Sequence, residues 1–388
     1  MSVTMERPGW IEVGRTFLTL GLTSFGGPLA HLGYFHREFV ERRRWISPEA
    51  FAEIVAVSQA LPGPSSSQAG LAIGWRLAGW RGALAAFVGF TTPSALLMLF
   101  FAVAAPWMTQ ALGGGWLGGL KAAAGAVVLI AVVQMARQTA PDMQRVLVLI
   151  VAAFAALGYG AAGQLWVLSV ALAMGAVVPP VAIATARPEP AGDVSRIGAV
   201  VGLTLILAAL GLLALAVTAP PSPPASAYGA GALVFGGGHA VLPLLEGEFV
   251  GRGWVERDAF LAGYGAAQAL PGPLFAFGAF LGATQGGLGM GLLTLLAIFL
   301  PGALLILGLE PLWPRLRRWA RLRGALALAG AAATGLLAAA FLNTVAPEAL
   351  STPATSLIAL GALLMLTVFK LPTPLVVAVA ALAGLAAG

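Results

Sequence analysis

The chain has 388 residues, of which 59% are hydrophobic and 9% are charged, and its formal net charge at pH 7 is +6. Soluble globular proteins carry about 25% charged residues, so this composition excludes a soluble enzyme or binding domain and indicates a function in or across a membrane. The absence of cysteine excludes disulfides and thiolate metal sites. The basic residues lie at the ends of apolar stretches, which is typical of membrane topology signals and argues against nucleic-acid binding.

The first apolar segments are too short to cross a bilayer. Residues 11–24 form a run of 14 residues, which as a helix is about 21 Å long, against about 30 Å of hydrocarbon. The run stops at Phe-Gly-Gly, residues 25–27, which we call the first FGG tip. Ser47 is the predicted N-cap of a second short helix, which ends at Pro-Gly-Pro, residues 62–64, the first PGP tip. A third short helix is predicted over 65–77, so we expect half-helices broken at these tips.

Longer apolar segments follow in each half of the chain. They predict an all-α polytopic membrane protein with about nine full spans in addition to the half-helix hairpins. The predicted spans are 82–104, 120–137, 146–160, 164–184, 197–217, 291–309, 324–342, 355–369 and 373–388.

The stretch 25–64 occurs twice. It returns at 235–273 with one residue fewer, and 18 of its 40 positions are identical in the second copy. An internal repeat of this strength indicates two homologous halves. We expect an N-terminal repeat over 1–186, a linker with one connecting transmembrane helix over 187–227, and a C-terminal repeat over 228–388.

The basic residues indicate that the two halves have inverted topology. Loop 36–49 holds four arginines and its counterpart 246–258 holds two, whereas loop 105–119 is uncharged and its counterpart 310–323 holds five. Because basic loops stay cytoplasmic, the N-terminus is expected in the cytoplasm and the second half upside down relative to the first, as in many secondary transporters. This holds if the broken segments re-enter the membrane; kinked or tilted full spans are the alternative.

The tips supply the candidate binding residues. Free N–H groups at half-helix starts bind anions, and the first PGP tip is followed by three hydroxyls and an amide that the second copy lacks. Glycines allow close approach of the backbone to a ligand. The candidate substrate-binding residues are Gly26, Gly27, His31, Gly63, Ser65, Ser66, Ser67, Gln68, Gly236, Gly237, His239 and Gly272. The serines could instead satisfy backbone carbonyls, and the glycines could serve helix packing.

A few ionisable residues are candidates for gating or coupling, namely Arg15, Arg37, Glu38 and Glu248. Glu38 and Glu248 occupy the same repeat position beside arginines, so we expect each to form a structural ion pair with a nearby arginine, and a role in gating or proton coupling is the second interpretation. The spacing of the three histidines argues against a zinc site, which needs three or four converging ligands.

The repeated motifs resemble those of the chromate ion transporter family. The resemblance rests on residues 25–28 with His31, on 36–38 and 43–45, on 61–64 with Gln68, and on the second-half motifs at 235–236, 242–243, Trp254 and 268–273. It covers nearly the whole chain and is closest to the long form of the family, with two fused halves. It implies a multi-pass carrier of a bacterial or archaeal inner membrane that exports chromate, driven by the membrane potential or a proton gradient.

The same resemblance implies no cofactor and no enzymatic activity. Its expected partners are chromate, sulfate as a competing substrate, and the lipid bilayer; a homodimer is left open. The alternatives are a transporter of sulfate or another oxyanion, and a passive anion channel. A membrane-embedded enzyme is disfavoured because the chain has no cysteine, cofactor motif or cluster of ionisable residues within its spans.

Overall fold

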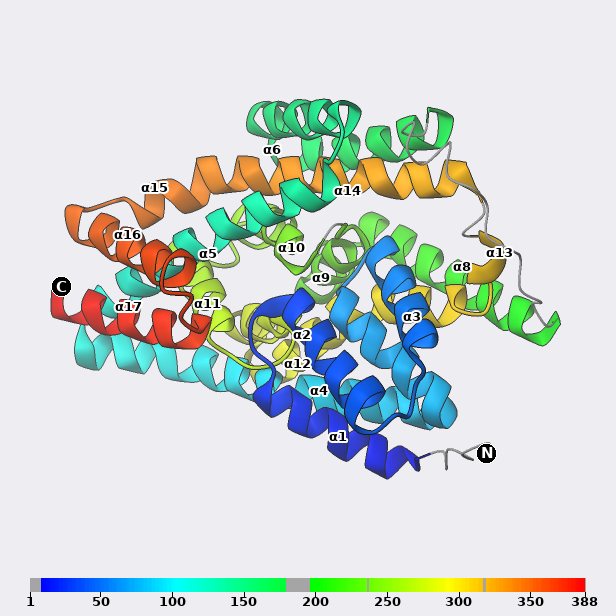
Figure 1. The fold of residues 1–388 in the computed structure, drawn as a ribbon. Helices are drawn as coiled ribbons and strands as arrows, with labels where there is room; N and C mark the ends of the chain where they lie inside the picture. Colours follow the sequence, from blue (N-terminus) through cyan, green and yellow to red (C-terminus); the bar gives the residue numbers. More distant parts are fainter. Residues whose placement is uncertain (1–7, 179–195, 236, 317–318, 388) are drawn as a thin grey trace.

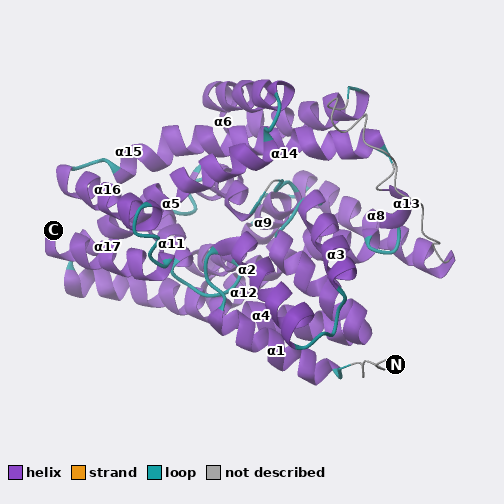
Figure 2. Ribbon diagram, viewed as in Figure 1, coloured by secondary structure: helices purple, strands orange, loops and turns teal. Residues whose placement is uncertain are grey.

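The computed structural model describes residues 8–178, 196–235, 237–316 and 319–387, and within them every regular element is a helix (Figure 2). The elements of the first half are α1 (Trp10–Thr23), α2 (Gly27–Phe35), the π-helix η1 (His36–Arg42), α3 (Pro48–Ala60), α4 (Ser65–Leu112), α5 (Gly115–Thr139) and α6 (Met143–Val177).

The second half is preceded by α8 (Arg196–Thr218), which lies where a connecting helix is predicted. The elements that follow are α9 (Pro223–Ala232), η2 (Gly238–Ala240), α10 (Val241–Leu245), η3 (Glu246–Val250), α11 (Arg257–Gln268), η4 (Leu274–Ala276), α12 (Phe277–Leu309), α13 (Trp313–Leu316), α14 (Ala320–Ala340), η5 (Phe341–Val345), α15 (Ala346–Ala349), α16 (Pro353–Thr367) and α17 (Thr373–Ala387). The expected boundary at 186/187 lies outside the described residues.

The helices confirm an all-α membrane protein. Over the described residues, five helices are long and apolar enough to cross a bilayer, and four shorter apolar helices accompany them. Large hydrophobic side chains are exposed along them, for example Phe100, Trp107 and Phe154, as expected of surfaces that face lipid. The number of spans and the inversion of the halves stay predictions.

The predicted half-helices are present at the first FGG and PGP tips. α1 ends at Thr23, and α2 begins at Gly27 behind Gly26, which has a φ of 97° that glycine adopts without strain. Ser47 caps α3 as predicted, because its side chain accepts a hydrogen bond from the N–H of Ala50. The predicted 65–77 helix is also confirmed: α4 is kinked at Ala78–Gly79, with φ values of −142° and 61°.

The same kink recurs in the second half. α12 is broken at Gly286–Gly287, where φ is −146° and 70°. The packing recurs as well: α4 lies against α1, and α12 lies against α9. A Cβ on Gly21 of α1 would lie 2.7 Å from the carbonyl oxygen of Phe90, and one on Gly231 of α9 would lie 2.1 Å from that of Ile298. Glycine is therefore required at the matching contact in both halves.

α6 doubles back on itself, in agreement with the two spans predicted at 146–160 and 164–184. The side-chain amide of Gln144 donates to the carbonyl oxygen of Val178 over 3.2 Å. A straight helix over Met143–Val177 would separate these ends by about 50 Å. The two arms pack against α14 of the second half (Figure 1), and residues 179–184 of the second predicted span lie outside the described residues.

The tips of the two halves exchange backbone hydrogen bonds. In the second half, the FGG tip is at residues 235–237 and the PGP tip at 271–273. The N–H of Gly63, in the first PGP tip, donates to the carbonyl of Val234, beside the second FGG tip, over 2.8 Å. The N–H of Gly272, in the second PGP tip, donates to the carbonyl of Ser24 beside the first FGG tip over 2.9 Å. Each PGP tip is therefore paired with the other half.

Two ionic clusters also join the halves. In the first, Arg76 of α4 binds Glu53 at 3.0 Å and Glu310 at 2.6 Å. In the second, Lys121 of α5 binds Asp258 at 3.0 Å and Glu348 at 3.2 Å. The segment α14–α15 runs between the neighbourhoods of the two clusters and is 30 residues long, about 45 Å. Figure 1 accordingly places α13 and α15 at opposite ends of the molecule.

We expect Gly63→Ala to destabilise the fold. A Cβ there would lie 3.0 Å from Gly302 Cα, and φ is 122°, so backbone strain of about 1–3 kcal/mol adds to a steric clash. Gly79→Ala is the matched control, since its φ is 61° but nothing lies within 4 Å. The melting temperature in detergent should fall further for Gly63→Ala; equal losses would contradict the close contact.

We expect Arg76→Gln to lower the free energy of unfolding by about 1–2 kcal/mol, because two partly buried carboxylates lose their shared cation, whereas an exposed pair contributes about 0–1 kcal/mol. Arg252→Gln, which breaks the more exposed Arg252–Glu248 pair, is the control. Thermal melts of both variants check this, and an equal effect would show that Arg76 contributes no more than a surface pair.

Candidate functional site

A small polar cavity lies where the two FGG tips and the second PGP tip come together. Its volume is about 260 Å³. The two FGG tips meet beside it: a Cβ on Gly238 would lie 3.1 Å from Pro28 Cγ, and His239 Nε2 lies 4.0 Å from the Cβ position of Gly27. The cavity is lined by Gly26, Gly27, Val127, Ile130, Ala131, Gln134, His239, Ala267, Gln268, Leu270, Gly272, Leu274, Leu366, Lys370, Leu371 and Thr373.

Three helical segments begin at this cavity. α2 starts at Gly27, η4 leads into α12 from Leu274, and α17 starts at Thr373, and all three residues line the cavity. The first N–H groups of a helix have no intrahelical partner, and the start of a helix carries partial positive charge. The cavity is therefore surrounded by backbone groups that favour an anion.

The side chains around the cavity have the same preference. Lys370 carries the only formal charge among the described residues that line it. His239 Nδ1 lies 2.8 Å from the hydroxyl of Tyr264, which is fully buried and holds the imidazole ring in place. Gln268 Nε2 is a buried donor with no hydrogen-bond partner among the described residues. This amide lies in the lining of the cavity, beside Tyr264.

The structure brings together part of the predicted site. Gly26, Gly27, His239 and Gly272 all line the cavity. Gly237 lies beside the cavity, and a Cβ built on it would lie 3.7 Å from Met135 Sδ. Gly236 lies outside the described residues. A contact of these glycines with substrate stays a prediction.

The serines predicted to bind an anion after the first PGP tip do not line this cavity. Ser65, Ser66, Ser67 and Gln68 are buried at the start of α4. Ser66 Oγ lies 3.2 Å from His31 Nδ1, and Gln68 donates to the carbonyls of Pro62 at 2.8 Å and Gly302 at 3.3 Å. Gly63 packs against Gln68 and Gly302. These four residues, which we call the serine cluster, thus lie against the first PGP tip.

Some polar atoms of this cluster remain unpaired. Ser67 Oγ and Gln68 Oε1 are buried without a hydrogen-bond partner among the described residues. A buried polar group without a partner costs about 1–3 kcal/mol, so these atoms favour an occupant such as water. The prediction that they contact the transported ion remains untested.

The candidate gating residues are placed as follows. Glu38 binds Arg42 at 2.9 Å and Arg43 at 2.5 Å. Glu248 binds Arg252 at 2.8 Å and accepts a hydrogen bond from Ser226 at 2.6 Å. The predicted pairing of both glutamates with neighbouring arginines is confirmed. Arg15 is exposed on α1, and Arg37 is exposed on η1.

Sequence reasoning missed Gln134, Lys370 and Thr373 as lining residues. Lys370 did carry a signal, because it is one of only two lysines and interrupts an apolar region just before Leu-Pro-Thr-Pro. Its φ of 53° is unusual for a residue other than glycine. Gln134 lies within an apolar predicted span, and nothing in the sequence indicated which face of that helix meets the tips.

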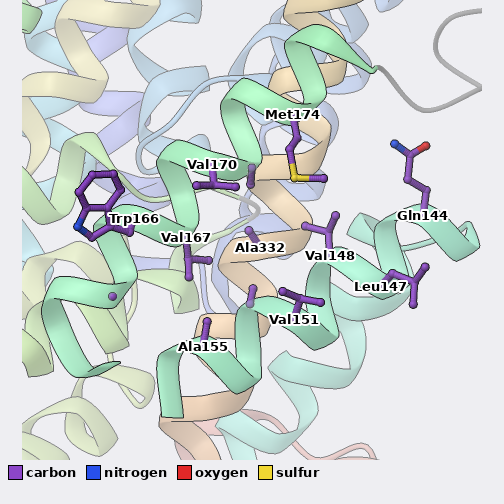
Figure 3. A pocket seen from close by; sticks show the side chains of 13 residues that line it. Gln144, Leu147, Val148, Val151, Ala155, Trp166, Val167, Val170, Met174 and Ala332 are labelled. Atoms are coloured by element: carbon purple, nitrogen blue, oxygen red, sulfur yellow. The ribbon is translucent and has the colours of Figure 1, made fainter. Parts of the chain in front are cut away.

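A larger cavity of about 860 Å³ lies between the two arms of α6 and α14 (Figure 3). Its side chains are almost entirely apolar, with Leu147, Val151, Trp166 and Met174 pointing into the space and Gln144 at its edge. An ion would lose its hydration there without gaining hydrogen-bond donors. This groove suits apolar contacts and does not suit an ion.

Comparison with known proteins agrees with the earlier resemblance. The chromate transporter family profile matches residues 11–178 and 225–385. A chromate transport protein of Pseudomonas aeruginosa is 32% identical over 74% of this chain and 69% of its own length. A probable chromate transport protein of Synechococcus elongatus is 29% identical over 96% of this chain and 94% of its own.

A third relative, the chromate transport protein of Cupriavidus metallidurans, is 29% identical over 96% of this chain and 91% of its own. No solved structure shows a significant match. The relatives are named as transporters, so the expectation of a transporter rather than an enzyme is confirmed. Profile and relatives cover both halves together with their tips, and the chain belongs to the chromate transporter family.

Proposed function

We propose that this protein is a secondary transporter that exports chromate, a tetrahedral dianionic oxyanion, from the cytoplasm across the inner membrane. The observation that carries the proposal is the polar cavity at the FGG tips, with three helix starts and Lys370 around it. A volume of about 260 Å³ lies below the roughly 300–1,000 Å³ of pockets for drug-sized ligands. It therefore suits a small ion that keeps a few waters.

Alternating access by the two halves is the mechanism we propose. Each PGP tip is bonded to the other half, so a movement of one half against the other changes the walls of the cavity directly. The Arg76 and Lys121 clusters join the halves at opposite ends. Opening one cluster while the other stays closed would expose the cavity to one side only. Inverted repeats, inferred from the arginine-rich loops, are typical of such carriers.

The direction of transport and the driving force that we propose follow from the negative charge of the substrate and the membrane potential. With the N-terminus in the cytoplasm, as the basic loops indicate, an interior-negative membrane potential favours movement of a dianion outward. Two charges crossing 100 mV gain about 4.6 kcal/mol. The membrane potential alone can therefore drive export, and a proton gradient is the second source of energy that we propose.

Sulfate is the second candidate substrate, because it has the same shape and charge as chromate and the cavity offers donors without a group that separates the two. A passive anion channel would use the same cavity. A channel, or a carrier driven by the membrane potential alone, accumulates chromate in energised inverted vesicles only up to its electrochemical equilibrium. Accumulation beyond that level would exclude a channel and show coupling to a second gradient such as that of protons.

We expect Lys370→Gln to lower kcat/KM for chromate uptake into inverted vesicles about tenfold, since a charge-assisted hydrogen bond contributes about 1.5–3 kcal/mol. Lys370→Arg, which keeps the charge, should retain most of the uptake. Unchanged uptake in Lys370→Gln would contradict the assignment of the cavity. Chromate-insensitive sulfate uptake by the unmodified protein would make sulfate the substrate.

The serine cluster is tested by a Ser65/Ser66/Ser67 triple alanine variant. Ser67 Oγ has no hydrogen-bond partner in the part of the chain that the structure describes, so its hydroxyl can donate to an anion that reaches the first PGP tip during transport. We expect chromate uptake to fall about tenfold in folded protein. Ser58→Ala, a buried serine whose hydroxyl donates to its own helix, is the control, and full uptake in the triple variant would exclude the serines from the path.

A further inference from the structure

A further cavity, with arginine side chains in its walls, lies between α1 and η1. Its volume is about 300 Å³, and its walls include Tyr34, Arg37 and three threonines of α1. It lies on the side of α1 where η1 packs, and it shares no lining residue with the cavity at the FGG tips. The family assignment and the proposed function leave it without a role.

The ion pairs around this cavity leave one positive charge free. Arg42 is bound to Glu38, and Arg43 is bound to Glu38 at 2.5 Å and to Glu12 at 3.1 Å. Two carboxylates thus neutralise two guanidinium groups. Arg37, which also lines the cavity, has no ion-pair partner among the described residues and is exposed. The cavity therefore carries a net positive charge centred on Arg37.

The threonines extend from this charge toward the first FGG tip. Thr16, Thr19 and Thr23 line the cavity at about one-turn intervals along α1, over about 10 Å. Three residues after Thr23, Gly26 lines the other cavity, and three residues span at most about 10 Å. The two cavities thus approach the turn at Ser24–Gly26 from different sides.

The threonine hydroxyls can serve an anion. At rest each donates to the carbonyl one turn earlier: Thr16 to Glu12 at 2.8 Å, Thr19 to Arg15 at 3.1 Å and Thr23 to Thr19 at 2.7 Å. A hydroxyl proton rotates freely between acceptors. Each hydroxyl can therefore turn from its carbonyl to a passing anion.

We propose that the α1–η1 cavity is a receiving site for the transported oxyanion, in which Arg37 captures the ion and the threonines lead it toward Gly26. This inference rests on the proposed function. By the arginine-rich loops the cavity belongs to the cytoplasmic side, where an exporter takes up its substrate. A positive site at the mouth of a path raises the local concentration of an anion and so lowers the apparent KM.

The phosphate of an anionic lipid has the same chemistry and is the other source of an anion here. The outward face of α1 exposes Trp10, Ile11, Leu18 and Leu22, which suits acyl chains. We favour the transported ion because the threonines lead inward to the FGG tip, where a lipid tethered by its chains has no place to go. The experiment separates the two sources.

The test is chromate uptake into inverted vesicles, whose outer face is the cytoplasmic one, with Arg37→Gln. We expect KM to rise roughly fivefold or more while the maximal rate stays within about twofold, because the cavity at the FGG tips is intact. Arg37→Lys should restore most of the loss, and the difference should shrink at high salt. Arg44→Gln removes the same charge from an exposed residue that lines a neighbouring hollow instead, and should leave KM unchanged.

Three results would overturn the inference. An unchanged KM in Arg37→Gln excludes capture by this residue, and an equal rise in Arg44→Gln shows a general surface-charge effect. If uptake depends on anionic lipid in the unmodified protein and loses this dependence in Arg37→Gln at unchanged KM, the cavity is a lipid site. If the unmodified protein moves no chromate, the proposed function fails and this inference fails with it. The three results above overturn this inference alone, because in them the unmodified protein still transports chromate.

Discussion

The structure depends on a reciprocal pair of backbone hydrogen bonds. Gly63 of the first PGP tip donates to Val234, and Gly272 of the second donates to Ser24. A non-helical backbone inside a bilayer is tolerated only where protein or water satisfies its polar groups. Each half thus satisfies a backbone N–H group at a PGP tip and a carbonyl beside an FGG tip of the other half. This mutual dependence places both FGG tips and the second PGP tip around one cavity.

In the proposed site, backbone groups would supply most of the attraction for an anion. Helix starts at Gly27, Leu274 and Thr373 supply partial charges, and one lysine supplies the formal charge. The proposed site needs no fully buried formal charge, which would be costly in a membrane when unoccupied. The arginines of the α1–η1 cavity lie instead at exposed or half-buried positions on a π-helix or directly after it. Water solvates their charge there.

The two halves are similar in their backbone and different in their side chains. Kinks, tips and glycine contacts recur at matching positions, because the path of the chain depends on them. The polar side chains after the PGP tips do not recur: the buried serines follow the first PGP tip only, and Leu274 and Phe275 follow the second. Conversely, the second PGP tip lines the polar cavity through Gly272, while Gly63 packs against Gly302. The hydroxyl groups and the polar cavity therefore lie at different PGP tips.

The sequence by itself determined the membrane setting, the helix starts and breaks, and the family, because these depend on composition, local propensity and motif spacing. Ser47, the FGG and PGP tips and the repeat could all be read from nearby residues. Only the tertiary structure decided which polar groups face a cavity. Lys370 lies about 100 residues from Gln268 and more than 300 from Gly27 along the chain, and they meet because α16–α17 pack against α5 and α11 beside the tips. Helix periodicity carries no information about such distant neighbours in a chain that is apolar on nearly every face, so Gln134 and Thr373 were missed.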